Sequence, residues 1–173
     1  MILFAVLAAP SCVRAEMRGE SAGLFWIDVP EGWVWTQEPG RVTIAEFNGS
    51  DRIVIRFAPV ENVADAAAAR QLVFDAREDR RREVVARHGK SVMRVERHMD
   101  GVFALQTGFL LFTPEGMRQA TSIVFFSKGH LFDVYFEAPR EVFRLEMEKI
   151  IETWRFTEPP AEKSEDDDGE TQA

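Results

Sequence analysis

Most of the chain alternates between short apolar segments and turn residues, as antiparallel strands do. The alternation predicts strands over residues 24–29, 33–38, 41–47, 52–58, 91–99, 102–113, 117–127 and 131–137. Between them lie Pro-Gly, Asn-Gly, Asp-Gly and Lys-Gly steps, whose residues tolerate the backbone angles of tight turns. The pattern therefore predicts two antiparallel groups of four strands each.

Two segments show the helical period instead. The first runs from about Val63 to Arg87, with Asp65 near its start and Gly89 as its stop. The second starts at Pro139, a favourable first helical residue, and runs to about Trp154. An apolar stripe along it consists of Phe143, Met147, Ile150, Ile151 and Trp154.

The later strands carry apolar residues at consecutive positions, in 109–112 and 123–126. Successive side chains of a strand point to opposite faces, so both faces of this sheet are apolar and each needs a cover. One helix on each face is the economical solution. We therefore expect an α+β fold, a three-layer α/β/α sandwich with a largely antiparallel central sheet.

Three of the four tryptophans lie in one eleven-residue stretch, FWIDVPEGWVW at 25–35. Trp33 and Trp35 share one face of their strand, and we favour the core or its edge for both, because buried aromatic rings dominate core energetics. Trp26 shares its face with Asp28, which leaves a ligand contact open for it. Trp26 and Trp35 are therefore candidate ligand or partner contacts.

The stretch LFWIDVPEGW and the closing segment FEAPREVFRLEMEKIIETWRF together resemble the PsbP-like superfamily, in its Mog, PsbP and DcrB-type members and their bacterial envelope branch. The resemblance covers residues 24–157. It implies an α/β/α sandwich that binds or helps to assemble larger complexes without catalysing a reaction. The hydrophobic pattern that carries it transfers no ligand residues.

Both ends of the chain differ from its centre. Residues 1–15 form an apolar run typical of a signal peptide, with cleavage expected after Ala15, so we expect a periplasmic or secreted protein. Lipidation at Cys12, the only cysteine, is less favoured than simple cleavage. Residues 16–157 then form a single domain without a transmembrane span. Residues 158–173 hold seven acids against one lysine and predict a disordered acidic tail.

Charge narrows the function classes. The tail contributes −6 and the leader +1 to a net charge of −8, which leaves −3 for residues 16–157. A mildly acidic domain is a poor nucleic-acid binder. His88, His98 and His130 lack the spacing of a metal motif, and His130 and Asp133 lie three residues apart, on opposite faces of a strand. We expect no metal, no cofactor and no catalytic residues.

The segment Arg77–Glu83 interleaves four arginines with three acids at spacings that allow pairs within a helix. A self-paired, solvated face is therefore favoured over an anion site. Arg80 lies four residues after Ala76 and four before Val84, so its stem is expected along the edge of the buried stripe with its head in water. Arg80 is the third candidate contact.

The leading hypothesis is a non-enzymatic extracytoplasmic binding or assembly module with an envelope protein as partner. The alternative is a carrier or sensor of a small apolar ligand. It rests on six phenylalanines that exceed the needs of a core: Phe109, Phe112, Phe125, Phe126, Phe132 and Phe136. A hydrolase with an unrecognised site is a third hypothesis.

Overall fold

The computed structural model describes residues 15–47, 51–138 and 141–159. In chain order their elements are β1 (Glu16–Gly19), β2 (Trp26–Val29), β3 (Trp33–Glu38), β4 (Arg41–Glu46), β5 (Arg52–Pro59), α1 (Ala66–Ala86), β6 (Gly89–Met99), β7 (Val102–Thr113), β8 (Gly116–Ser127), β9 (His130–Ala138) and α2 (Glu141–Glu152). Seven strands form one antiparallel sheet in the order β3-β4-β5-β9-β8-β7-β6, and β1 pairs with β2 separately.

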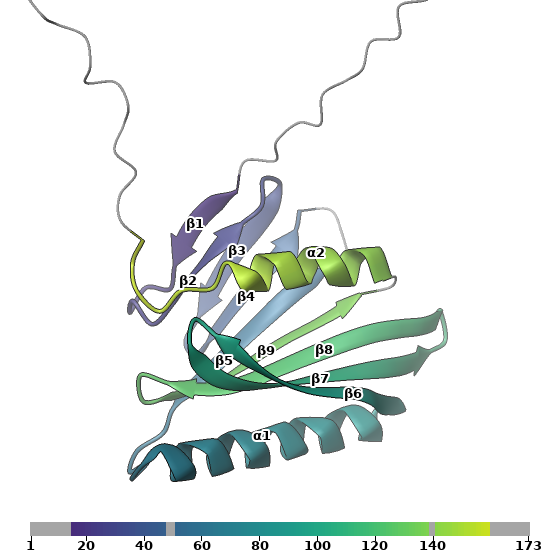
Figure 1. Ribbon diagram of the computed structural model, residues 1–173. Coiled ribbons are helices and arrows are strands. Elements are labelled where there is room, and N and C mark those ends of the chain that lie inside the picture. The colour runs from purple at the N-terminus through teal and green to yellow at the C-terminus, as the bar shows by residue number, and fades with distance from the viewer. Residues whose placement is uncertain (1–14, 48–50, 139–140, 160–173) are drawn as a thin grey trace, which may run out of the picture.

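The prediction of a first group of four paired strands is wrong for β2, which pairs with β1 outside this sheet; β3 to β5 meet the second group in the middle of the sheet, where β5 pairs with β9. One face is covered by α1, which packs on β6, β7 and β8, whereas α2 lies on the other face against β8 and β9. Figure 1 shows the sheet between the two helices, with the β1–β2 hairpin on the α2 side. The α+β fold, a three-layer sandwich around an antiparallel sheet, is therefore confirmed.

Each predicted helix and strand is present, with boundaries displaced by three residues or fewer. Strand β1 was not predicted, because its four residues are mostly polar. The helix stop was assigned wrongly: α1 ends at Ala86, and His88 adopts the left-handed backbone, with φ of 63°. Gly89 already belongs to β6, where a Cβ atom would lie 2.5 Å from the Val84 side chain. The glycine therefore allows β6 to approach α1 closely.

The α2 side holds the main core. Its largest buried rings are Phe25, Phe125, Phe132, Phe136 and Trp154. Phe25 stacks on Trp154 with ring centroids 4.2 Å apart, which joins the entry to β2 to the end of α2. Trp33 and Trp35 are partly buried against this core, as predicted for the core edge.

The stripe of α2 is confirmed for the residues whose side chains the structure describes, because Met147, Ile150, Ile151 and Trp154 are all buried. The side chain of Phe143 lies outside that part of the chain. Among the described residues, no helix combines the length and apolarity that crossing a bilayer requires. The predicted leader and tail fall largely on residues 1–14 and 160–173, outside the described residues.

The α1 side is smaller and more polar. Two apolar clusters lie under α1, one around Phe109 and one around Leu105. The helix itself buries Val73, Arg77, Arg80 and Val84, which are spaced four, three and four residues apart along one stripe. The middle of the contact between α1 and the sheet is therefore occupied by two guanidinium groups.

We predict that Trp154→Ala lowers the free energy of unfolding by about 3–5 kcal/mol, because the ring is 1% exposed and its loss leaves a cavity in the main core. Trp33→Ala should cost less, since that ring is only partly buried. Chemical denaturation of both variants measures the difference. Equal losses would contradict the assignment of Trp33 to the edge of the core.

Candidate functional site

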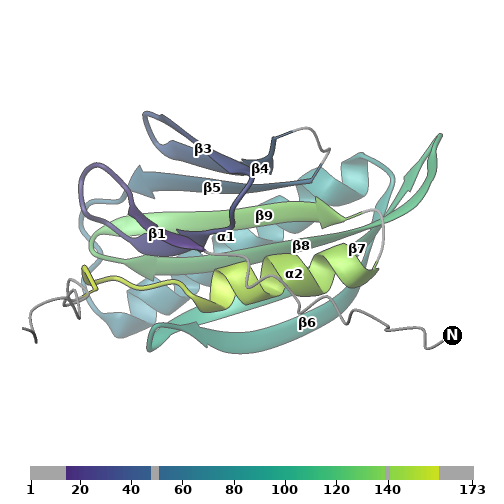
Figure 2. The ribbon, with the colours of Figure 1, turned by 90° about the horizontal axis from the view of Figure 1, so that it is seen from above.

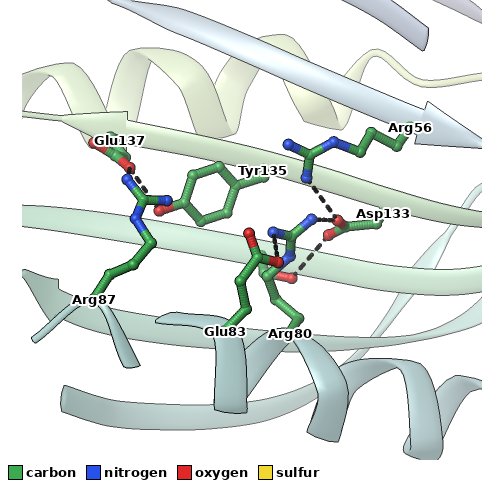
Figure 3. Close-up of polar contacts among 8 residues, drawn as sticks. Arg56, Arg80, Glu83, Arg87, Asp133, Tyr135 and Glu137 are labelled. Atoms are coloured by element: carbon green, nitrogen blue, oxygen red, sulfur yellow. Dashed lines mark hydrogen bonds and ion pairs between the residues drawn. The ribbon is translucent and has the colours of Figure 1, made fainter. Parts of the chain in front are cut away.

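The most polar contact inside the fold lies between α1 and the centre of the sheet (Figure 3). Arg80 reaches down from α1, and its guanidinium donates to the Asp133 carboxylate of β9 and, at 2.5 Å, to Glu83. Arg56 of β5 approaches Asp133 to 3.5 Å, and the Ser122 hydroxyl donates to it at 3.1 Å. One carboxylate therefore meets two guanidinium groups and a hydroxyl.

A second cluster of polar side chains lies next to the first, around Tyr135 and Glu137 of β9. The Tyr135 hydroxyl donates to Glu137 at 2.8 Å, while Arg87 and Arg118 approach the same carboxylate to 3.7 and 3.8 Å. The Arg80 guanidinium lies 5.2 Å from the centre of the Tyr135 ring, which links the two groups. Burial, and then the hydrogen bond to Glu137, raises the pKa of Tyr135 well above its ordinary value.

Burial lowers the pKa of Arg80, and the charge of Glu83 acts in the opposite direction. A guanidinium keeps its proton at any physiological pH even so. The Nε atom of Arg80 is buried without a hydrogen-bond partner. The two terminal nitrogens of the Arg80 guanidinium are therefore bound by carboxylates, whereas its Nε atom is not.

The polar contact continues onto a part of the sheet that α1 does not cover. On this side of β4 and β5, Arg41 pairs in register with Arg56, and Arg52 pairs with Glu137. We call this surface the arginine face; it consists of Arg41, Arg52, Arg56, Arg80, Arg87 and Arg118. The carboxylates that pair with arginines of this face are Glu38, Glu83, Asp133 and Glu137. A protein of net charge −8 thus displays a local excess of positive charge.

Both carboxylates of β9 on this side are paired with arginines. Asp133 is paired with Arg80 and Arg56, and Glu137 with Arg87 and Arg118. His130 points to the α2 side, where it lies beside Phe132, so it is on the opposite face from Asp133, as predicted. No cluster of potential metal ligands occurs among the residues that the structure describes.

Comparison with known proteins gives a likeness of fold. A scan against models of protein families finds no match, and a search of curated proteins finds none either. Among solved structures, cyanobacterial PsbP (CyanoP) from Synechocystis sp. PCC 6803 aligns with a TM-score of 0.63 and 8% identity over 87% of this chain and 97% of that one.

Two further structures align over most of their length. The Ran-binding protein Mog1p from Saccharomyces cerevisiae gives a TM-score of 0.51 at 8% identity, covering 83% of this chain and 96% of its own. LpqN of Mycobacterium tuberculosis, described as involved in cell envelope biogenesis, gives 0.52 at 12% identity, covering 82% and 89%. The chain has the PsbP-like fold.

Within this PsbP-like fold the three predicted contact residues do not form one site. Trp35 lies on the α2 side, 6.1 Å from Phe25 between ring centroids, whereas Arg80 lies on the α1 side. Trp26 packs on Gly19, where a Cβ atom would come within 2.5 Å of the indole nitrogen, and Lys128 lies 5.5 Å from its ring centroid. Their role as ligand or partner contacts stays a prediction.

Arg80 corrects one prediction. Its head is not in water: the residue is only 8% exposed, and its guanidinium is bound by Asp133 and Glu83. The self-paired helix face is confirmed for its neighbours, since Arg81 pairs with Glu78 and Arg82 with Asp79. The sequence did carry a signal for the missed partner, because Asp133 is a single acid within the otherwise apolar run LFDVYF.

The six phenylalanines of the small-ligand hypothesis do not share one environment. Phe109, Phe125, Phe132 and Phe136 are buried in the core, and Phe112 is exposed. An open pocket of about 330 Å³ does lie between α1 and the β6–β7 hairpin, lined by Arg70, Val73, His98 and Phe103 among others. Of the six phenylalanines, Phe126 alone lines it. Four of the six rings therefore belong to the buried core clusters.

Removal of the carboxylate at the centre of the cluster should destabilise the fold. We predict that Asp133→Asn costs about 3 kcal/mol, because Arg80 then keeps a buried charge without its main partner. Glu83→Gln is the matched control and should cost less than about 1 kcal/mol, because Glu83 is about half exposed. Chemical denaturation measures both values. Similar small losses would show that Arg80 does not depend on Asp133.

Tyr135 should titrate abnormally. It is the only tyrosine, so phenolate absorbance reports on it alone. The folded state holds the phenol proton more tightly than the unfolded state, so the stabilisation is complete below about pH 10 and is lost as the pH rises through the folded pKa. We expect no phenolate step near pH 10 in the folded protein.

Glu137→Gln supplies the control for this titration. It removes the hydrogen-bonding carboxylate and leaves the burial of the ring in place, so the pKa should fall but stay above its ordinary value. A folded protein that forms phenolate at about pH 10 would contradict the buried position of the hydroxyl.

Proposed function

We propose that this protein is a non-enzymatic binding module that acts outside the cytoplasm and docks an acidic segment of an envelope protein on the arginine face. The observation that carries the proposal is the excess of guanidinium groups on an uncovered part of the sheet. Arginine is well suited to this role, since its planar group can bind a carboxylate through two parallel hydrogen bonds.

The geometry divides the arginine face into a support and a contact surface. Arg80 is buried and tied to Asp133, which fixes the carboxylate against the sheet. Arg56 is 47% exposed beside it, Arg41 lies opposite Arg56 on β4, towards the edge of the sheet, and Arg52 lies four residues away on β5. The exposed guanidinium groups have carboxylates on one side and solvent on the other, so an acidic segment can bind without displacing Asp133.

The extracytoplasmic setting is supported by the leader pattern at residues 1–15 and by the likeness to LpqN, which is described as involved in cell envelope biogenesis. The protein-binding role is supported by the likeness to Mog1p, which is described as Ran-binding. Both likenesses concern the fold, so the partner's chemistry is argued from the arginine face of this chain.

Crosslinked pull-down from an envelope fraction tests the proposal. The double variant Arg52→Gln/Arg56→Gln should recover roughly tenfold less of the partner than the unaltered protein, because two charged contacts are lost. The loss should shrink at high salt, which screens the same contacts.

The matched control is Arg18→Gln/Arg82→Gln. It removes the same charge from exposed positions on β1 and on α1. Thermal melting should show that both double variants fold. Equal recovery by the two variants would place the partner elsewhere on the molecule, and failure to recover any protein with the unaltered chain would argue against a binding module.

A further inference from the structure

The other end of the sheet presents a long strand with no neighbour in the described part of the chain. β6 has eleven residues and pairs with β7 on one side only. Figure 2 shows it along the margin of the sheet, with no helix or strand beyond it. An unpaired edge offers a row of free backbone donors and acceptors to any strand that can lie beside it.

Three exposed side chains of this edge are apolar, next to charged ones. Val92, Met93 and Val95 are exposed, and they lie on the α2 side of the sheet, where the Met93 side chain lies over Gly108 of β7. Proteins commonly protect an exposed edge by charge, by proline or by a covering element. Here a bulge between Ser91 and Met93 interrupts the first part of the strand, and 93–97 is regular.

The charged residues in the regular part of β6 favour a second copy of β6 as the strand that pairs with it. Two copies of β6 can pair antiparallel across a two-fold axis, and the residue on the axis sets every other pair. An axis at Arg94 places Arg94 against itself, and an axis at Glu96 places two glutamates together. An axis at Val95 places each Arg94 opposite Glu96 of the other copy, on the α1 side, and pairs the two Val95 side chains on the α2 side.

We infer that the protein forms a two-fold dimer in which β6 pairs with β6 of a second copy, with the axis at Val95. The sheets of both copies then become continuous, the two Val95 side chains are buried against each other, and Met93 lies opposite Arg97 of the other copy. Arg94, which makes no ion pair within the residues described here, gains one. Glu96 has Arg70 at 3.8 Å as an exposed partner and can accept a second guanidinium.

The dimer leaves the arginine face free, because its contact residues Arg41, Arg52 and Arg56 lie on β4 and β5, towards the opposite edge of the sheet. The inference therefore does not depend on the proposed function, and each can fail without the other. In the dimer the two arginine faces lie at the two ends of one continuous sheet.

Sedimentation velocity of the purified full chain over a range of concentrations tests the dimer. We expect a concentration-dependent dimer for the unaltered protein and a monomer for Val95→Lys, which places two ammonium groups at the axis. Val34→Lys is the matched control, because Val34 is a valine of the same 43% exposure on the other edge strand, β3. It should sediment as the unaltered protein does.

A charge exchange tests the register. Arg94→Glu and Glu96→Arg should each weaken the dimer by roughly tenfold or more, because each puts like charges opposite one another twice. The double variant Arg94→Glu/Glu96→Arg restores both opposite pairs and should recover the dimer. No other register of β6 against itself predicts this recovery.

The inference is overturned if the unaltered chain stays monomeric at every concentration. It is overturned equally by a dimer that persists in Val95→Lys, because such a dimer would use another surface. A third result would rule out only the register centred on Val95. In that case Val95→Lys abolishes the dimer, but the double variant Arg94→Glu/Glu96→Arg dimerises no better than its two single variants.

Discussion

The long strands β7, β8 and β9 carry large side chains on both faces, and neither face can be left in water. The two faces are covered by different physical means. On the α2 side, aromatic rings from β2, β8, β9 and the end of α2 stack into one core. On the α1 side, the helix places two arginines at the centre of its buried stripe. Arg80 is paired with the Asp133 carboxylate of the sheet beneath it, whereas Arg77 pairs with Glu78 of the helix itself.

Much of the fold could be predicted from the sequence, because local patterns determine it. Turn residues delimit the strands, and the double-sided apolar runs at 109–112 and 123–126 require two covering layers. The same alternation predicts that the side chains of Trp33 and Trp35 lie on one face of their strand, at the edge of the core. Strand β1 could not be predicted in this way, because its stability comes from pairing with β2 rather than from its own mostly polar residues.

The site was less predictable because its partners lie far apart in the sequence. Arg80 and Asp133 are 53 residues apart, and only the docking of α1 on the sheet brings them together. The helix pattern showed that Arg80 lies near the stripe but could not show a carboxylate beneath it. Arg52 and Arg56 were more accessible to prediction, because they alternate with Ile53 and Ile55 and must therefore share the opposite face of the strand.

The pairing of β5 with β9 has a consequence for the order in which the chain can fold. Residue 52 lies opposite residue 137, so the middle of the sheet joins segments that are far apart along the chain. Strands β3 to β5 and strands β6 to β9 can each form their hairpins locally, but neither group completes the sheet alone. The loop between them must close first, and such long-range pairing is slow compared with helix or hairpin formation. Until then β5 and β9 are both open edges, and the ring of Phe25 has no Trp154 to stack on.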